Sequence, residues 1–343
     1  MKVSGLKNTT RLYKVKRPEL INDLYIIDTP SGRDVACKPH IVGKALKSAC
    51  FEAALEAAKA MNGLLNISKE ESIVMEHILR AAPGYELHRA FETLNPKNRL
   101  RQVWIRPRYT IPSYRDHGDH ARRLEVVHED FREFPSNTSI TLIKPDTEAT
   151  GASSEKAIRE ALEEAEKVGS KIEKVILYGF IARDALQLLK ETAEENDFRL
   201  IAFAMEDVME LAHNKYDMTL YGLDFSYWER FREPRKLSST VPYEVLQDFL
   251  PDFVPGSDQP GDFSSRQSRL FNGNKWETGT IFCHLTNSAR LIRGLKSISR
   301  GEPWYHHDEI INKRLRELQW TRVKYFPHSL LYPKETFSCI RGA

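Results

Sequence analysis

Between residues 138 and 214, short apolar segments alternate with helix-like segments, and this alternation restricts the fold more than any other feature of the chain. TSITLI, KVILYGFIA and FRLIAFAM are apolar throughout, while SSEKAIREALEEAEKVG and RDALQLLKETAEEN repeat apolar residues at helical spacing. Such strands are buried on both faces, as in a parallel sheet covered by its crossover helices. We therefore predict an α/β fold with a doubly wound, mostly parallel sheet. EDVMELAHN, residues 206–214, is expected to form a short helix.

The preceding residues add further elements to this sheet. DLYIIDTPSGRDVA, residues 23–36, predicts an N-terminal hairpin of two short strands around a Pro-Ser-Gly turn. The remaining patterns predict a helix over residues 41–65, strands over 72–79 and 101–110, a second helix after Pro83-Gly84, and a polar loop over 111–125.

The composition changes after about residue 235. Pro, Gly and Ser become frequent there, and two helix-like segments follow, TGTIFCHLTNSARLIRGLKSIS and YHHDEIINKRLRELQW. We therefore divide the chain into an α/β domain, residues 1–235, and a C-terminal extension, residues 236–343, of mainly helical and irregular structure.

The overall composition excludes several classes of protein. The chain has 343 residues, 41% of them hydrophobic, and a net charge of +3, so neither disorder nor a general attraction to nucleic acid is expected. The apolar run at 175–182 is too short to span a bilayer, and the N-terminus lacks the apolar core of a signal peptide. We expect a cytoplasmic protein without membrane or nucleic-acid partners. Its many Glu, Lys and Arg residues hint at a thermophile, and its four scattered cysteines predict reduced thiols.

One segment, IKPDTEATGASS at residues 143–154, carries the clearest indication of a binding site. It runs from the end of an apolar strand through an acid and a small-residue loop into a helix. This order directs several backbone N–H groups and the positive end of a helix dipole at one point, which suits a phosphate. In doubly wound sheets, ligands bind beyond the carboxyl ends of the strands, where this loop is expected.

The same segment resembles the donor-binding loop of type I phosphoribosyltransferases. The uracil phosphoribosyltransferase loop, roughly Ala-Thr-Gly-Gly-Ser, is most similar to residues 149–153. Three other segments resemble the family in the same order: ILRAAPGYE (78–86) its pyrophosphate loop, SYRDHGD (113–119) its mobile loop, and MTLYGLD (218–224) its base-binding region. The resemblance covers about residues 70–230 and implies the family's fold over that part.

The resemblance implies a set of site residues and a reaction. The reaction would transfer phosphoribose from 5-phosphoribosyl 1-pyrophosphate to a uracil-like base or related acceptor, with Mg²⁺ accompanying the donor, in a homodimer or higher homo-oligomer. The phosphate would bind to Ala149, Thr150, Gly151, Ala152 and Ser153, the pyrophosphate to Arg80, Ala81 and Ala82, and the base to Tyr221, Gly222, Leu223 and Asp224, with Asp146, Arg80 and Arg115 as catalytic residues.

The chemistry of these residue types agrees with such roles. Backbone N–H groups satisfy a dianion without loss of side-chain entropy, and Gly151 permits close approach. Asp146 can accept hydrogen bonds from ribose hydroxyls and stabilise positive charge at the anomeric carbon, and Glu148 can assist it or face water. Arg80 offers a planar fork for pyrophosphate, over which Arg115 can close.

The chain departs from the family at three positions. Pro145 replaces the first acid of the loop, after Lys144, which can neutralise phosphate charge, and alanines at 82 and 152 replace glycines. Each added methyl group narrows the space for backbone to approach a phosphate. These departures support an alternative interpretation, in which the chain is a relative that binds a phosphoribosyl ligand or nucleotide without catalysis.

Other clusters support alternative interpretations. Asp116, His117, Asp119 and His120 indicate a solvated loop, a loop that closes over a phosphorylated substrate, or the metal centre of a hydrolase. YHHDE (305–309) marks a helix start or a second such cluster, and WERFREPRK (228–236) marks a packed surface or an RNA contact. Tyr221 or Tyr227 can stack on an aromatic acceptor.

Overall fold

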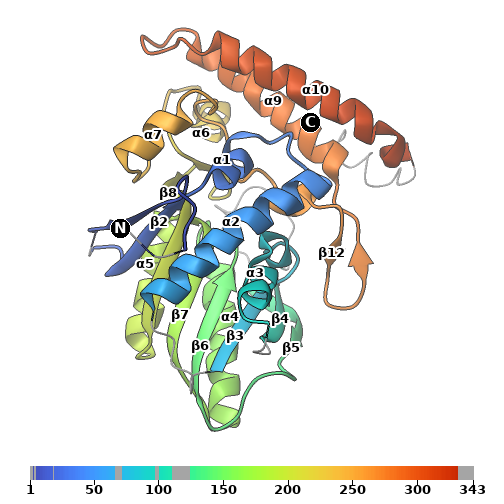
Figure 1. Cartoon of the computed structure of the whole chain (residues 1–343). Coiled ribbons are helices and arrows are strands. Elements are labelled where there is room, and N and C mark those ends of the chain that lie inside the picture. Colours follow the sequence, from blue (N-terminus) through green and yellow to red (C-terminus); the bar gives the residue numbers. More distant parts are fainter. Residues whose placement is uncertain are drawn as a thin grey trace.

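The centre of the protein is a nine-stranded sheet. The computed structural model (Figure 1) describes residues 3, 5–17, 19–65, 72–96, 100–109 and 124–330, except for the side chains of residues 327–330. Eight strands follow one another in the order β1-β2-β8-β7-β6-β3-β4-β5, and β9 pairs with β8. Their bounds are β1 Arg11–Val15, β2 Asp23–Asp28, β3 Ser72–Ile78, β4 Arg101–Tyr109, β5 Leu124–Asp130, β6 Ser139–Pro145, β7 Lys171–Ala182, β8 Arg199–Leu211 and β9 Met218–Thr219.

The six neighbouring strands from β2 to β4 in this order run parallel to one another. Among the strands that the structure describes in this sheet, the antiparallel pairs are β1 with β2, β5 with β4, and β9 with the end of β8. This topology confirms the predicted α/β class with a mostly parallel sheet.

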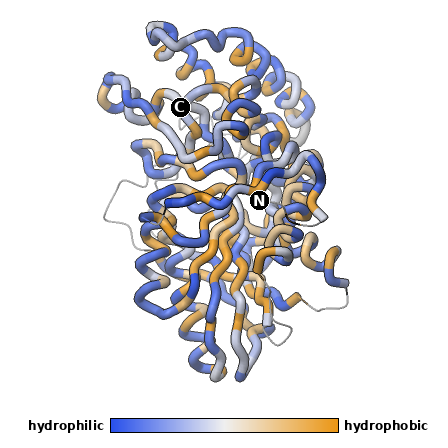
Figure 2. The backbone as a smooth tube through the Cα atoms, turned by 60° about the vertical axis from the view of Figure 1, so that its left-hand side comes forward, coloured by the Kyte–Doolittle hydropathy of each residue, from blue (hydrophilic) through white to orange (hydrophobic). Residues whose placement is uncertain are grey.

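Helices cover both faces of the sheet. On one face the core contains side chains of α1 (Pro30–Cys37), α2 (Gly43–Leu64) and α3 (Leu87–Leu94), and on the other those of α4 (Ala152–Lys167) and α5 (Arg183–Glu195). Successive residues along β2 and β7 belong alternately to the two cores, as the two-residue period of a strand requires. Figure 2 shows the apolar strands in the interior, with hydrophilic helix surfaces outside.

The residues after 235 pack directly against this core. Arg266 is fully buried, and its guanidinium donates hydrogen bonds to the backbone carbonyl groups of Val35, Lys38, Ile41 and Pro260. The remaining elements are η1 Ala82–Tyr85, β10 Gly222–Leu223, α6 Phe225–Phe231, β11 Lys236–Leu237, α7 Tyr243–Phe249, α8 Phe263–Arg266, β12 Leu270–Phe271, β13 Trp276–Glu277, α9 Ile281–Ser299 and α10 Asp308–Leu330. Helices α9 and α10 lie side by side at one end of the molecule (Figure 1).

The expected hairpin over residues 23–36 is wrong in its second half. An N-terminal hairpin exists, but it pairs β1 with β2, and the residues after β2 form helix α1. Thr29 caps this helix by accepting a hydrogen bond from the Gly32 N–H, and Pro30 occupies its first turn. Both residues are ordinary helix-start signals, and they outweigh the turn propensity of Pro-Ser-Gly.

The expected helix over residues 206–214 is also wrong, because β8 continues to Leu211. Glu210 and Leu211 pair with Thr219 and Met218 of β9, and Val208 bridges Thr240. Backbone partners from later in the chain therefore decide this segment against its helix-like pattern.

The cysteines only partly follow the expectation of reduced thiols. Cys37 and Cys50 are free and buried, and burial raises the pKa of the Cys50 thiol to about 12. Cys283, however, is disulfide-bonded, which corrects the expectation for this residue. Disulfide pairing depends on proximity in space, which the spacing of cysteines along the chain does not reveal. Among the described residues, no helix has the length and apolar character needed to span a bilayer.

Candidate functional site

The segment after β6 forms a loop that lies along β7 and leads into helix α4. Asp146 donates its backbone N–H to the Tyr178 carbonyl at 2.9 Å, and Glu148 donates to the Phe180 carbonyl at 2.8 Å. Gly151 precedes the helix with φ of 82°, a left-handed conformation that favours glycine. The first half of the loop is thus fixed to the sheet, and its second half turns sharply into the helix.

Several backbone N–H groups at this turn are available to a ligand. Among the hydrogen bonds between described residues, none engages the N–H of Thr150, Gly151 or Ser153, and the Ala152 N–H only approaches the Thr150 hydroxyl at 3.4 Å. Helix α4 has 16 residues, so its dipole adds partial positive charge here. Free N–H groups at the start of a helix suit a phosphate or another anion.

Gly179 of β7 lies directly against this loop. A Cβ atom at this position, where φ is 143°, would lie 1.9 Å from the Asp146 carbonyl oxygen. We expect Gly179→Ala to lower the free energy of unfolding by about 2–4 kcal/mol, since backbone must move to admit the methyl group. Urea unfolding measures this loss, with Gly301→Ala as the control because its Cβ would meet nothing within 4 Å. Equal stability of the two variants would contradict the expectation.

Two buried carboxyl groups, those of Asp146 and Glu148, belong to the loop. Burial and then the neighbouring Glu148 carboxyl raise the pKa of Asp146, and burial raises the pKa of Glu148, while the charge of Lys144 opposes both shifts. Glu148 does not face water: it is 2% exposed and accepts a hydrogen bond from the Ser154 hydroxyl at 2.5 Å. A cationic group entering beside Asp146 would favour its ionised form.

Lys144 does not neutralise a phosphate in this arrangement, which corrects that expectation. Its Nζ atom donates to Glu76 Oε2 at 2.6 Å, and both side chains are fully buried. Glu76 lies on β3, the strand next to β6, so the ion pair forms within the sheet rather than at its edge.

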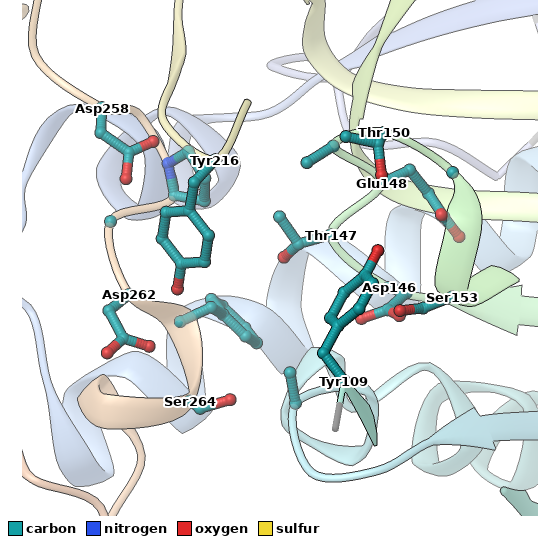
Figure 3. Close-up of a pocket in the computed structure, with 16 residues that line it drawn as sticks. Tyr109, Asp146, Thr147, Glu148, Thr150, Ser153, Tyr216, Asp258, Asp262 and Ser264 are labelled. Carbon is teal, nitrogen blue, oxygen red and sulfur yellow. The ribbon is translucent and has the colours of Figure 1, made fainter. Parts of the chain in front are cut away.

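The loop forms one wall of a pocket with a volume of about 170 Å³. The facing wall comes from Tyr216 and, in the C-terminal part, from Asp258 and residues 260–264 (Figure 3). Figure 3 shows Thr147 and Thr150 on one side of the space, and Tyr216 on the other. Two parts of the chain that are distant in sequence therefore enclose the pocket together.

The described residues that line the pocket carry more negative than positive charge. Their ionisable side chains are the carboxyl groups of Asp146, Glu148, Asp258 and Asp262 and the phenols of Tyr109 and Tyr216, without a Lys, Arg or His. Within the described ranges, no group of three or more His, Cys, Asp or Glu side chains is arranged to hold a metal ion. The free N–H groups of the loop are thus the main anion-binding feature of the lining.

Most of the proposed donor-binding residues lie at this pocket. Those that line it are Ala81, Asp146, Ala149, Thr150, Gly151 and Ser153, while Ala152 begins α4 without lining the pocket and Ala82 is fully buried. Arg80 is not in the lining, since its Nη1 atom forms an ion pair with Glu277 Oε2 at 2.8 Å. Arg115, His117 and His120 lie outside the described residues, as does the whole of segment 113–119.

The expected base-binding residues are not brought to the pocket. Gly222 and Leu223 pair with β11, Tyr221 packs near Phe253, and none of the segment 221–224 lines the pocket. Asp224 is 1% exposed, and its carboxylate accepts hydrogen bonds from the backbone N–H groups of His213 and Tyr227. Its role as the cap of helix α6 therefore occupies the side chain that was expected to reach a base.

Sequence reasoning missed the facing wall. The segment PGSDQPGDF, residues 255–263, signals turns through its Pro, Gly and Asp residues but gives no indication of a ligand. It reaches the pocket because Gln259 donates its backbone N–H to the Met218 carbonyl at 2.8 Å and Asp258 accepts from the Met218 N–H at 3.0 Å.

Behind this wall, Asp207 of β8 is fully buried beside Gln259, whose amide approaches it at 3.4 Å. Burial raises the pKa of Asp207 from 3.8 to about 7, against the lowering effect of the neighbouring Ser239 hydroxyl and Gln259 amide. The folded protein therefore holds the Asp207 proton more tightly than the unfolded chain does. This contribution to the free energy of unfolding is complete below about pH 4 and is lost as the pH rises to about 7. We therefore expect wild type to lose roughly 1–3 kcal/mol relative to Asp207→Asn between pH 4 and 8. Urea unfolding at several pH values measures this difference, and parallel stability curves would contradict it.

Comparisons with known proteins give only distant similarities. No family model matches the chain, and no curated protein does. Among solved structures, the AQ2163 protein from Aquifex aeolicus is 17% identical with a TM-score of 0.39, covering 55% of this chain and 86% of that one. An adenine phosphoribosyl transferase from Trypanosoma brucei is 14% identical with a TM-score of 0.36 and coverages of 58% and 88%. An orotate phosphoribosyltransferase from Francisella tularensis is 13% identical with a TM-score of 0.29 and coverages of 62% and 80%.

Proposed function

We propose that this protein is a phosphoribosyltransferase-like enzyme, which binds 5-phosphoribosyl 1-pyrophosphate and transfers the phosphoribosyl group to a nucleobase or related acceptor. The observation that carries the proposal is the loop from Asp146 to Ser153, where N–H groups that no other described residue engages adjoin a buried carboxyl group at the start of α4. The 5′-phosphate would accept hydrogen bonds from Thr150, Gly151 and Ser153. The ribose hydroxyls would then lie within reach of Asp146.

The proposed reaction needs positioning rather than a covalent nucleophile. A nitrogen of the acceptor attacks the anomeric carbon, the bond from that carbon to the pyrophosphate oxygen breaks, and pyrophosphate leaves with the bonding electron pair. Positive charge develops on the sugar in the transition state, and the Asp146 carboxylate stabilises it. The two walls of the pocket hold the reactants in line and exclude water.

The acceptor would bind against the facing wall of the pocket. Tyr216 and Phe263 offer aromatic surface there, and the Asp262 carboxylate offers hydrogen-bond acceptors for ring or amino N–H groups. A planar base fits this chemistry, and the sequence resemblance points to a uracil-like pyrimidine. In this proposal the C-terminal part supplies the acceptor side of the site.

Mg²⁺ fits the proposal as a partner of the donor. It is commonly held by one or two carboxylates together with substrate phosphates and water, rather than by a cage of protein ligands. The Asp146 carboxyl at the pocket meets that need, and the described residues offer no larger ligand group. When bound, the ion would screen the pyrophosphate charge, which the acidic lining by itself does not do.

A second candidate is a non-catalytic protein that binds a nucleotide or the donor. Two observations favour it: the described lining has no basic side chain, and Arg80 is paired with Glu277 instead of pointing into the pocket. Such a protein would use the same loop for the phosphate but would leave the glycosidic bond intact.

The deciding experiment offers the protein the donor, Mg²⁺ and a panel of nucleobases, and measures pyrophosphate release. We expect release that depends on one base, together with thermal stabilisation by the donor alone. Stabilisation without release would establish the binding protein instead. Neither stabilisation nor release at millimolar donor would exclude both functions.

A further inference from the structure

The hairpin of β12 and β13 approaches the loop that carries Arg80. Phe271 of β12 packs edge-on against Trp104 of β4, with 5.5 Å between ring centroids, beside the sheet edge formed by β4 and β5 (Figure 1). The end of β13 then brings Glu277 to Arg80, almost two hundred residues earlier in the sequence. Their contact is an ion pair of 2.8 Å between Arg80 Nη1 and Glu277 Oε2.

A second arginine belongs to the same cluster. Arg106 donates a hydrogen bond from Nη1 to the Asn272 carbonyl at 3.0 Å, and the Asn272 side chain donates to Glu277 Oε1. Burial and then the neighbouring Arg80 guanidinium lower the pKa of Arg106. Two guanidinium groups therefore lie near one another and near the Glu277 carboxylate, which pairs with Arg80 and opposes the lowering of the Arg106 pKa.

This arrangement has the chemistry of an anion-binding site in which a carboxylate of the protein itself, that of Glu277, takes the place of the anion. Guanidinium groups bind carboxylates and phosphates through the same planar donor geometry, so a phosphate oxygen can replace Glu277 at Arg80. The Arg80 and Glu277 side chains are 34% and 27% exposed, so solvent and small anions reach the pair. A diphosphate also carries more charge than one carboxylate and can engage both arginines.

The backbone of the Arg80 loop is held independently of Glu277. Gln267 donates its side-chain amide to the Ala81 carbonyl at 2.9 Å, and Phe263 stacks on Tyr85 with 4.3 Å between centroids. Removing the Glu277 charge should therefore release the Arg80 side chain without loosening its loop.

We infer that Glu277 is an internal competitor for anions: its carboxylate occupies a site beside Arg80 and Arg106 to which a diphosphate group binds by displacing it. The inference rests on the proposed function for the identity of the ligand, and it adds Arg106 and the C-terminal hairpin to the donor site. The β12–β13 hairpin thereby sets the concentration of diphosphate at which Arg80 exchanges Glu277 for the ligand.

The test is calorimetric titration of the full chain with inorganic pyrophosphate. Glu277→Gln keeps the size of the side chain and an acceptor for Asn272, and we expect it to bind pyrophosphate about fivefold more tightly, as for loss of a partly exposed charged pair. Glu302→Gln is the matched control, because it also removes a glutamate from an ion pair, with Lys236 at 3.1 Å. Arg80→Ala should weaken binding and remove the effect of Glu277→Gln in the double variant. Thermal unfolding verifies that each variant is folded, and Glu277→Asp provides a charged variant with shorter reach.

Unchanged or weaker pyrophosphate binding by folded Glu277→Gln and Glu277→Asp would overturn the inference. Ribose 5-phosphate separates this result from the proposed function, since it has the 5′-phosphate but no diphosphate and should bind equally to wild type and Glu277→Gln. Binding of ribose 5-phosphate without an effect of Glu277 on pyrophosphate would refute the inference alone. Tighter pyrophosphate binding by Glu277→Gln in a protein that ignores ribose 5-phosphate would support the competitor and refute the proposed function.

Discussion

Replacing Gly151 with valine is expected to weaken ribose 5-phosphate binding at least about 100-fold, or roughly 3 kcal/mol. Gly151 has φ of 82°, and a Cβ atom there would lie 3.0 Å from Ala185 Cα, which belongs to the backbone of α5. A branched side chain therefore strains the turn and moves the N–H groups of Thr150 and Ser153 away from a common point. Isothermal titration calorimetry with ribose 5-phosphate measures the loss.

Gly169→Val is the matched control for this change. Gly169 follows the same helix at its other end, also with positive φ (70°), and its Cβ would meet the Asn137 side chain at 2.8 Å. Both variants should lose stability from backbone strain, but only Gly151→Val should lose the ligand. If both bind ribose 5-phosphate like wild type, the loop does not hold the phosphate.

The second large effect is expected on turnover rather than on binding. Asp146→Asn should lower kcat for pyrophosphate release by about 100- to 1,000-fold, the cost of removing one group that stabilises charge in a transition state. KM for the donor should change less than about threefold, because the ground-state sugar carries little positive charge. Asparagine keeps the size of the buried side chain and one acceptor oxygen, so the fold should tolerate it.

Asp258→Asn is the control for Asp146→Asn, because it removes one carboxyl group from the opposite wall of the same pocket. The Asn side chain can still accept the hydrogen bond from the Met218 N–H. A similar loss of kcat in both variants would mean that the total charge of the pocket matters, and not the position of Asp146 beside the sugar. Mild effects of Asp146→Asn and Gly151→Val alike would refute the proposed site.

Half of the site follows from local sequence. The apolar runs ending at Ile143 and Ala182, and the amphipathic helices after them, match strands and helices of the structure because each has a repeat that its own residues set. Parallel strands place their carboxyl ends on one edge, so the position of the loop at 146–151 follows from the order of elements. Gly151 is the local feature that permits the sharp turn, since its φ is 82°.

The other half required contacts that no local pattern encodes. The wall that contains Asp258 reaches the pocket through the hydrogen bonds of Met218 with Asp258 and Gln259, and Arg80 meets Glu277 through the β12–β13 hairpin. The same holds for Lys144, whose pairing with Glu76 depends on β3 lying next to β6.

By itself, the amino-acid sequence determined the class of fold and the position of the loop at residues 146–151, since hydrophobic period and turn residues act over a few neighbouring positions. The tertiary structure alone decided which distant segments complete the pocket and which charged groups pair, because those choices depend on packing the whole chain at once. Lys144 and Arg80 illustrate the reason: a charge removed from water must find its partner in space, wherever along the chain that partner lies.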